Sequence, residues 1–60
     1  MGFYKMRALK MARNENQITD KQFEVVSNRY AFYEDNEWEF QVADNSVFVA
    51  DHYRGEEIRY

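Results

Sequence analysis

The sequence contains no cysteine and no proline, and only two glycines and one histidine. Without cysteine the fold can have neither a disulfide nor a thiolate metal site, and the default compartment is the cytosol. No window approaches the roughly 20 apolar residues of a membrane span, and the start MGFYKMRALK lacks the apolar run of a secretory signal. We therefore expect a cytoplasmic protein without a membrane segment, whose core depends on side-chain packing alone.

The size of the chain limits that core. A chain of 60 residues forms one domain and buries only about 60% of the surface that its unfolded form exposes. Five Tyr, five Phe and one Trp compensate, since each aromatic side chain can bury about 150 to 250 Å². So small a core cannot hide all of them, and we expect some aromatic side chains at an interface.

The charges divide between the two halves of the chain. Residues 1–30 carry six basic and three acidic side chains, a net charge of +3, and residues 31–60 carry two basic and eight acidic side chains, a net charge of −6. Such a distribution can steer association with a charged partner, although it is also common on solvated surfaces.

The clearest secondary-structure signal lies at residues 37–42. Trp38, Phe40 and Val42 alternate with polar residues, as in a strand that is buried on one face. Clusters of Asp, Asn, Glu and Ser at residues 34–37 and 44–46 indicate turns on both sides. Asn45, which tolerates the left-handed conformation, suits a tight hairpin into a further strand at residues 46–53.

The rest of the chain is compatible with more strands. Gly55 marks a turn before a short terminal strand that buries Ile58, and QFEVVSN at residues 22–28 is rich in β-forming residues. Residues 12–21 are polar and indicate a long loop that Ile18 attaches to the core. The rival interpretation is a helix starting at Asp20, because Thr19 and Gln22 have the spacing of a capping box.

The segment from Phe3 to Arg13 decides the fold class. As a helix it consists of strong helix formers, with Met6 and Leu9 three residues apart. As a strand it puts Tyr4, Met6 and Ala8 on one face and requires a bulge before Leu9. We favour the strand and keep the helix as the alternative.

The order of these features resembles an SH3 domain. Ala8-Leu9 resembles the start of the ALYDY motif, the polar loop to Lys21 resembles the RT loop, and residues 23–26 resemble the strand that follows it. Trp38 lies near the family's tryptophan after an acidic turn, and residues 49–53 resemble the closing segment of the domain. The resemblance spans nearly the whole chain and implies a small five-stranded barrel.

The same resemblance extends to only some of the residues that form the proline-peptide groove of SH3 domains. The ALYDY tyrosine positions fall on Lys10 and Ala12, and the position of the groove proline falls on Ala50. Trp38 and Tyr53 remain as groove residues. The resemblance therefore supports the fold more than the ligand.

These signals together predict one all-β domain over residues 1–60, a five-stranded SH3-like barrel. The alternative is an α+β fold in which an N-terminal helix packs on a three-stranded antiparallel meander.

The chain carries no signature of catalysis or of a metal site. His52 and Asp51 are adjacent in a predicted strand, so their side chains point to opposite faces and do not share a site. Glu34, Asp35, Glu37 and Glu39 lack the spacing of a cation-binding loop. We expect no enzyme activity, no cofactor and no metal.

The leading functional hypothesis is a non-enzymatic module that binds another protein through an edge strand or an aromatic surface around Tyr33, Trp38 and Tyr53. A small acidic inhibitor or adaptor of the kind that phages and mobile elements encode has this character. One alternative is nucleic-acid binding through Tyr4, Lys5, Arg7 and Lys10, which the acidic total charge opposes. Another is a homodimer or larger homo-oligomer formed through an exposed edge strand.

Overall fold

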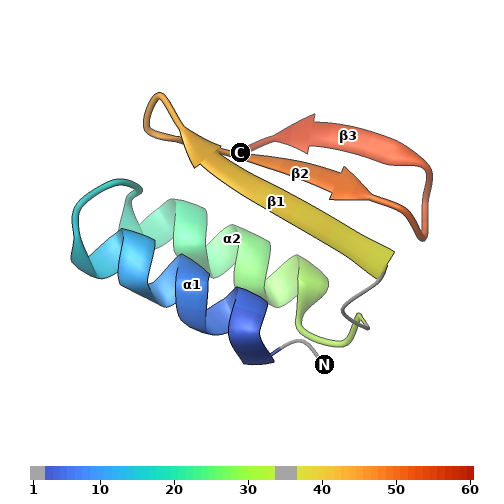
Figure 1. Cartoon of the computed structure of the whole chain (residues 1–60), viewed down its shortest axis with the longest axis horizontal. Coiled ribbons are helices and arrows are strands. Elements are labelled where there is room, and N and C mark those ends of the chain that lie inside the picture. The colour runs from blue at the N-terminus through green and yellow to red at the C-terminus, as the bar shows by residue number, and fades with distance from the viewer. Residues whose placement is uncertain (1–2, 34–36) are drawn as a thin grey trace.

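The protein folds into two layers, with two helices packed against one face of an antiparallel sheet (Figure 1). This computed structural model describes residues 3–33 and 37–60, and side chains from residue 5 onward. The elements in chain order are α1 (Phe3–Asn14), α2 (Asp20–Tyr30), β1 (Trp38–Ala43), β2 (Ser46–Asp51) and β3 (Glu56–Arg59).

The predicted five-stranded SH3-like barrel is wrong. The described part of the chain forms an open three-stranded sheet of order β1-β2-β3, and the fold is α+β. The segments predicted as strands at residues 3–13 and 22–28 are both helical. The alternative gave the correct class and the three-stranded meander, but it contained one helix where the structure has two.

Helix α1 forms because a helical period gives this segment one continuous core face. Leu9 and Ala12 are buried three residues apart, and Met6 packs against the same core. A strand would have needed a bulge to bring these side chains to one face, and the helix does not. The residues of α1 also have high helix propensity, so local preference and packing agree.

Asn16 ends this helix in the left-handed conformation, with φ of 62°. Its N–H donates to Arg13 O at 3.0 Å, and the N–H of Gln17 donates to Ala12 O at 2.9 Å. These two bonds are the pair of a Schellman motif, in which Asn is one of the few residues other than Gly that tolerate the required φ. The chain then reverses, and Ile18 is buried in the core as predicted.

Helix α2 starts with the capping box that was the rival interpretation of this segment. The Thr19 side chain accepts a hydrogen bond from the Gln22 N–H, and the Gln22 side chain accepts one from the Thr19 N–H. Val26 and Tyr30, four residues apart, are buried, whereas Val25 is exposed. Burial therefore follows the helical period and not the alternation of a strand, and this outweighs the β propensity of the segment.

The second half of the chain is pleated as predicted. Trp38, Phe40 and Val42 of β1 pair with Asp51, Val49 and Val47 of β2, and all six side chains point toward the helices. The two-residue turn between these strands has positive φ at Asp44 (53°) and Asn45 (58°), as a type I′ hairpin requires.

A further turn leads into β3. Gly55 lies there at φ 69°, and Ile58 of β3 is half-buried. The predicted turn at residues 34–37 falls largely outside the described residues. No helix in the described ranges is long and apolar enough to cross a membrane.

The core lies between the two layers and centres on Trp38. Its indole ring is 0% exposed. It stacks on Tyr30 of α2, with ring centroids 4.9 Å apart, and on Phe40 at 5.6 Å. Trp38 thus joins the sheet to the helices.

Candidate functional site

A row of aromatic rings leads from the core to the surface at one end of the molecule. Tyr30 stacks on the buried Trp38 and meets Tyr33 edge to face at 5.4 Å. Tyr33 in turn contacts Tyr53, with ring centroids 5.4 Å apart. The buried end of the row therefore supports rings at its exposed end.

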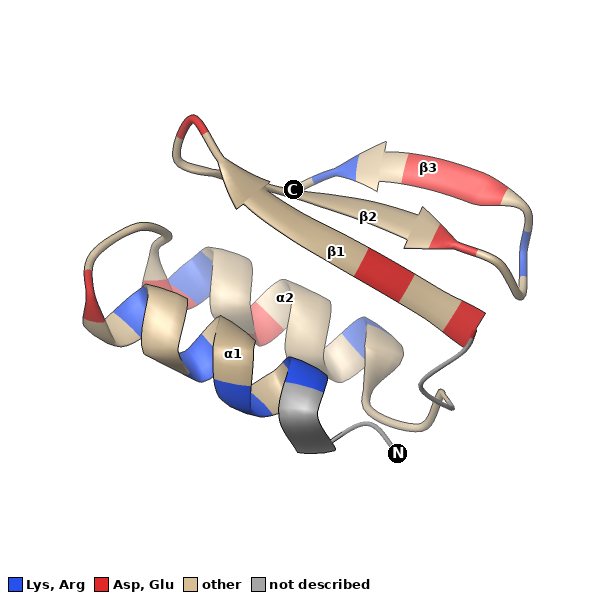
Figure 2. Cartoon of the chain, in the orientation of Figure 1, with Lys and Arg blue, Asp and Glu red and all other residues tan. Residues whose placement is uncertain are grey.

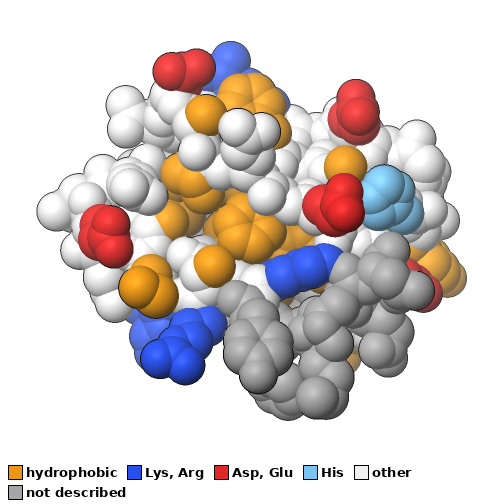
Figure 3. Space-filling model, in the orientation of Figure 1, with side chains coloured by type: hydrophobic (Ala, Val, Ile, Leu, Met, Phe, Trp, Pro, Cys, Tyr) orange, Lys and Arg blue, Asp and Glu red, His pale blue; other side chains and the backbone are white. Residues whose placement is uncertain are grey.

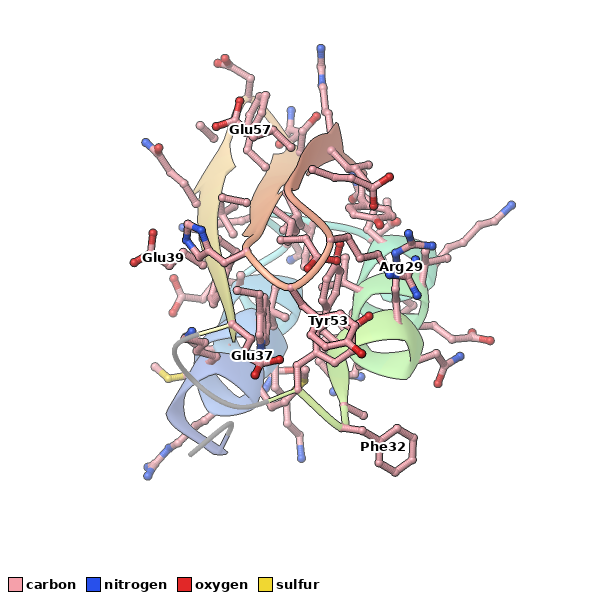
Figure 4. All side chains as sticks on the ribbon, turned by 90° about the vertical axis from the view of Figure 1, so that its right-hand side faces the viewer. Arg29, Phe32, Glu37, Glu39, Tyr53 and Glu57 are labelled. Carbon is pink, nitrogen blue, oxygen red and sulfur yellow. The ribbon has the colours of Figure 1, made fainter. Side chains whose placement is uncertain are left out.

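The exposed end of this row, together with Phe32, forms what we call the aromatic patch: Phe32, Tyr33 and Tyr53. Phe32 is 94% exposed and Tyr53 is 69% exposed, while Tyr33 is half-buried and contacts both Tyr30 and Tyr53. Figure 4 shows the end of the molecule that carries the patch, with the Phe32 ring projecting away from the body of the protein. An aromatic ring that is not packed in the core can bury its surface against a partner.

Two turns hold the aromatic patch in place. Where α2 ends, the N–H of Tyr33 donates to Tyr30 O at 3.2 Å. The turn after β2 is tied to the start of β1, because the N–H of Tyr53 donates to Glu37 O at 3.2 Å. The patch therefore joins the end of the helical layer to the end of the sheet.

The residues predicted to bind a protein are divided between surface and core. Tyr33 and Tyr53 lie together, as the hypothesis requires, but Trp38 is completely buried and cannot touch a partner in this fold. Phe32 was not among the predicted binding residues. The signal that could have found it was the position of Phe32 just after a capped helix whose apolar period ends at Tyr30.

Asp51 is a buried carboxylate next to the patch with a structural role. Its Oδ1 accepts a hydrogen bond from the Arg54 N–H at 3.0 Å, and Arg54 Nε lies 4.0 Å from Oδ2. Asp51 thus stabilises the turn that carries Tyr53. His52 points elsewhere and lies 3.4 Å from Glu39 on the exposed side of the sheet. The two residues do not converge on a site.

Tyr30 joins α2 to the C-terminal end of β3. The hydroxyls of Tyr30 and Tyr60 share a hydrogen bond of 3.1 Å, and Arg29 forms an ion pair with Glu56 at 3.6 Å. Burial is the main cause that raises the pKa of the Tyr30 phenol well above its usual range, and the hydrogen bond to Tyr60 adds to it. Tyr30 is therefore neutral in the folded protein and acts as a packing residue.

The residues of the nucleic-acid hypothesis lie on a helix and not on a strand. Lys5 is held by the sheet, because its ammonium donates to Trp38 O and lies 5.1 Å from the centre of the Trp38 ring. Burial lowers the pKa of Lys5, and the Glu39 carboxylate partly offsets this. Arg7 and Lys10 are exposed. The side chain of Tyr4 is outside the described part of the structure.

The charge asymmetry of the sequence becomes an asymmetry between the two layers. Figure 2 shows most Lys and Arg positions on the helices and most Asp and Glu positions on the sheet and its turns. Every described charged side chain within α1 is basic, and β3 begins with two glutamates. The protein therefore presents a basic and an acidic side.

The outer face of the sheet is hollowed around Phe48, a residue that is 39% exposed. The depression measures about 520 Å³ and is bordered by polar side chains, including Glu39, Gln41, Glu57 and Arg59. The Arg59 guanidinium lies 5.5 Å from the centre of the Phe48 ring and covers part of it. Ligand sites usually enclose most of a small molecule, and this open face does not.

No group of three or more potential metal ligands occurs within residues 3–33 and 37–60. The acidic cluster considered in the sequence falls partly outside this part of the chain, since Glu34 and Asp35 are not described. Comparisons with protein-family models, with curated proteins and with solved structures found no match to this chain.

Proposed function

We propose that this protein is a non-enzymatic interaction module that binds another protein through the aromatic patch. The observation that supports the proposal most is the 94% exposure of Phe32 beside the Tyr33–Tyr53 pair. Aromatic side chains on a rigid support are the residues that most often dominate protein interfaces, because they bury a large area and lose little conformational entropy.

The patch combines apolar area with polar atoms. Its two tyrosine hydroxyls can donate hydrogen bonds at the rim of an interface, and the exposed Arg54 adjoins Tyr53 in the same turn. This composition suits a partner with an apolar pocket for Phe32 and carbonyl or carboxylate groups around it. An inhibitor or adaptor of this size would act by occupying such a surface.

The test is site-specific photo-crosslinking in cells, with a photoreactive amino acid at position 32 or at the control position 48. We expect a partner that crosslinks from position 32 and not from position 48. With that partner purified, Phe32→Ser and Tyr53→Ala should each weaken binding about tenfold or more, a loss of about 1.4 kcal/mol or more. Phe48→Ser should leave the affinity unchanged.

Trp38→Ala is unsuitable for this experiment because it would disrupt the core. Equal affinities for the parent protein and the Phe32→Ser, Tyr53→Ala double variant would refute the proposal.

A second candidate function, nucleic-acid binding, is supported by the basic character of α1. Arg13 pairs with Asp20 at 3.8 Å and Lys5 is bound to the sheet, which leaves Arg7 and Lys10 for phosphate contacts. Contact of two cations with duplex DNA would give a slope of about −2 in a plot of log affinity against log salt concentration. Fluorescence anisotropy with labelled oligonucleotides measures this slope, and Arg7→Glu should abolish the binding.

A further inference from the structure

The main-chain groups of β1 are divided between its two sides. In a hairpin closed by a two-residue turn, the residues flanking the turn form a hydrogen-bonded pair, and such pairs alternate along the ladder. Ala43 is the flanking residue in β1 and pairs with Ser46. Two residues in the middle of β1, Phe40 and Val42, therefore direct their N–H and C=O groups away from β2.

Contacts at the start of β1 agree with this division. Glu37 O accepts a hydrogen bond from the His52 N–H at 2.7 Å, which places it on the β2 side. The next carbonyl, Trp38 O, accepts from the Lys5 ammonium on the opposite side. In the described part of the chain, no other element hydrogen-bonds the main chain of Phe40 or Val42. β1 is therefore an edge strand, and on the side away from β2 the main-chain groups of Phe40 and Val42 are unpaired.

The helical layer is wider than the sheet that it covers. Two packed helices span about 20 Å, because neighbouring helix axes lie about 8 to 10 Å apart and each helix is about 10 Å wide. Three strands spaced about 4.8 Å apart span only about 14 Å. A fourth strand at the same spacing would bring a three-stranded sheet to about the width of two packed helices.

Exposed apolar side chains of α1 lie one and two turns after Lys5, the residue that contacts β1. On the opposite side, α2 is bound to β3, since Arg29 pairs with Glu56 and Tyr30 bonds to Tyr60. On the β1 side, Ala8 is exposed on α1 one turn after Lys5, and Met11 is 53% exposed. Figure 3 shows hydrophobic side chains at the surface between α1 and β1.

On the outer face of this edge the charges favour basic side chains, whereas the Lys5 ammonium lies at the edge itself, against Trp38 O. Glu39 lies on the outer face of β1 with its side chain 74% exposed, and Glu15 is exposed just after the end of α1. A strand laid beside β1 would place its outward side chains opposite Glu39 and Gln41, where Lys or Arg would form favourable cross-strand pairs.

We propose that the β1 edge binds one extended segment of a partner protein as a fourth strand. Phe40 and Val42 provide its main-chain hydrogen bonds. Its inward side chains are apolar and cover α1 near Ala8, and its outward side chains are basic. A second copy of this chain does not fit the same position, because two α1 helices would have to lie beneath adjacent strands only about 4.8 Å apart. The site shares no residue with the aromatic patch and does not depend on it.

The probe is a blocked peptide of sequence Lys-Val-Lys-Val-Lys-Val-Lys, titrated into isotope-labelled protein and followed by amide chemical shifts and hydrogen exchange. We expect the Phe40 and Val42 amides to show the largest shifts, and their exchange to slow about tenfold or more at saturation. The same peptide with proline at its centre, which cannot pair along its whole length, should bind at least about tenfold more weakly.

Matched variants locate the site on the protein. Val42→Pro removes an outward N–H that β2 does not use, so β1 should still pair with β2, although the change at a core-packed side chain should lower stability. Binding by the folded variant should fall about tenfold or more. Glu57→Pro makes the same change at the free edge of β3 and should leave binding unchanged. Ala8→Arg places a bulky cation on the part of α1 that the partner strand would cover, so it should also weaken binding. Asn14→Arg adds the same charge on another side of α1 and should leave binding unchanged.

Absence of binding at millimolar peptide would overturn the proposal, and so would shifts centred on β3 or on the aromatic patch. Sedimentation showing a dimer that Val42→Pro dissociates would also overturn it, because the edge would then be occupied by a second copy. Since the aromatic patch has its own variants, each proposal can fail without affecting the other.

Discussion

Trp38 is a core residue and not a binding residue, so its replacement by alanine should destabilise the protein severely. The ring is fully buried, stacks on Tyr30 at 4.9 Å and Phe40 at 5.6 Å, and has the Lys5 ammonium 5.1 Å from its centre. Truncation of a buried Trp to Ala costs about 3 to 5 kcal/mol. A domain of this length has a total stability of about 3 to 9 kcal/mol at about 0.05 to 0.15 kcal/mol per residue. Trp38→Ala should therefore remove between about a third and all of this stability.

Two comparison variants make this prediction specific to burial. Trp38→Phe keeps a ring in the site and removes an indole N–H that is buried without a hydrogen-bond partner. It should therefore cost less than half as much as the alanine variant. Tyr53→Ala changes an exposed ring and should alter the free energy of unfolding by no more than about 0.5 kcal/mol.

Urea unfolding followed by far-ultraviolet circular dichroism measures all three variants, since this signal comes mainly from the backbone and persists without the tryptophan. As Trp38 is the single tryptophan of the chain, the fluorescence of the parent protein gives an independent check. Its emission should be blue-shifted when folded and move to the red on unfolding. A folded Trp38→Ala variant that loses less than about 1 kcal/mol would refute the assignment of Trp38 to the core.

Three further predictions concern stability. The raised pKa of Tyr30 means that the unfolded chain releases this proton first. Stability should therefore fall as pH rises past about 10, by up to about 1.4 kcal/mol per pH unit, and Tyr30→Phe should reduce that slope in urea titrations. Gln22 Nε2 donates to Asn45 O at 2.8 Å, so Gln22→Glu should cost about 1 to 2 kcal/mol while the capping bond to Thr19 remains. A loss no larger than that of an exposed substitution would contradict this role. Gly55 has φ of 69° and open space where a Cβ would lie. Thermal unfolding should therefore show that Gly55→Ala costs about 1 kcal/mol and Gly55→Asn less.

The helix at residues 20–30 shows why a correct capping signal was not sufficient to predict the secondary structure of this segment. The spacing of Thr19 and Gln22 indicated a capped helix, but Phe23, Val25 and Val26 have high β propensity and also fit an alternating pattern. Only the core distinguishes the two interpretations, by burying Val26 and leaving Val25 in solvent.

Long-range packing also explains why Trp38 is buried while the other two predicted binding residues, Tyr33 and Tyr53, lie together nearer the surface. Strand alternation correctly put Trp38 on the inward face with Phe40 and Val42. The complete burial of Trp38 depends on Tyr30, which stacks on it. Tyr30 belongs to α2, a segment that was predicted as a strand. The exposure of Phe32 depends on where that helix ends. Neither fact is contained in the residues near Trp38.

Features that depend on neighbouring residues were predictable from the sequence: the alternation of β1, the turn at Asp44 and Asn45, the turn at Gly55, the burial of Ile18 and the charge difference between the two halves. These follow from side-chain period, from tolerance of positive φ and from composition. The three-dimensional packing was needed to show that the first half is helical, that Trp38 lies in the core and that the outer edge of β1 is unpaired. Those outcomes depend on which distant surfaces bury one another, because the packing of two layers can override local propensity.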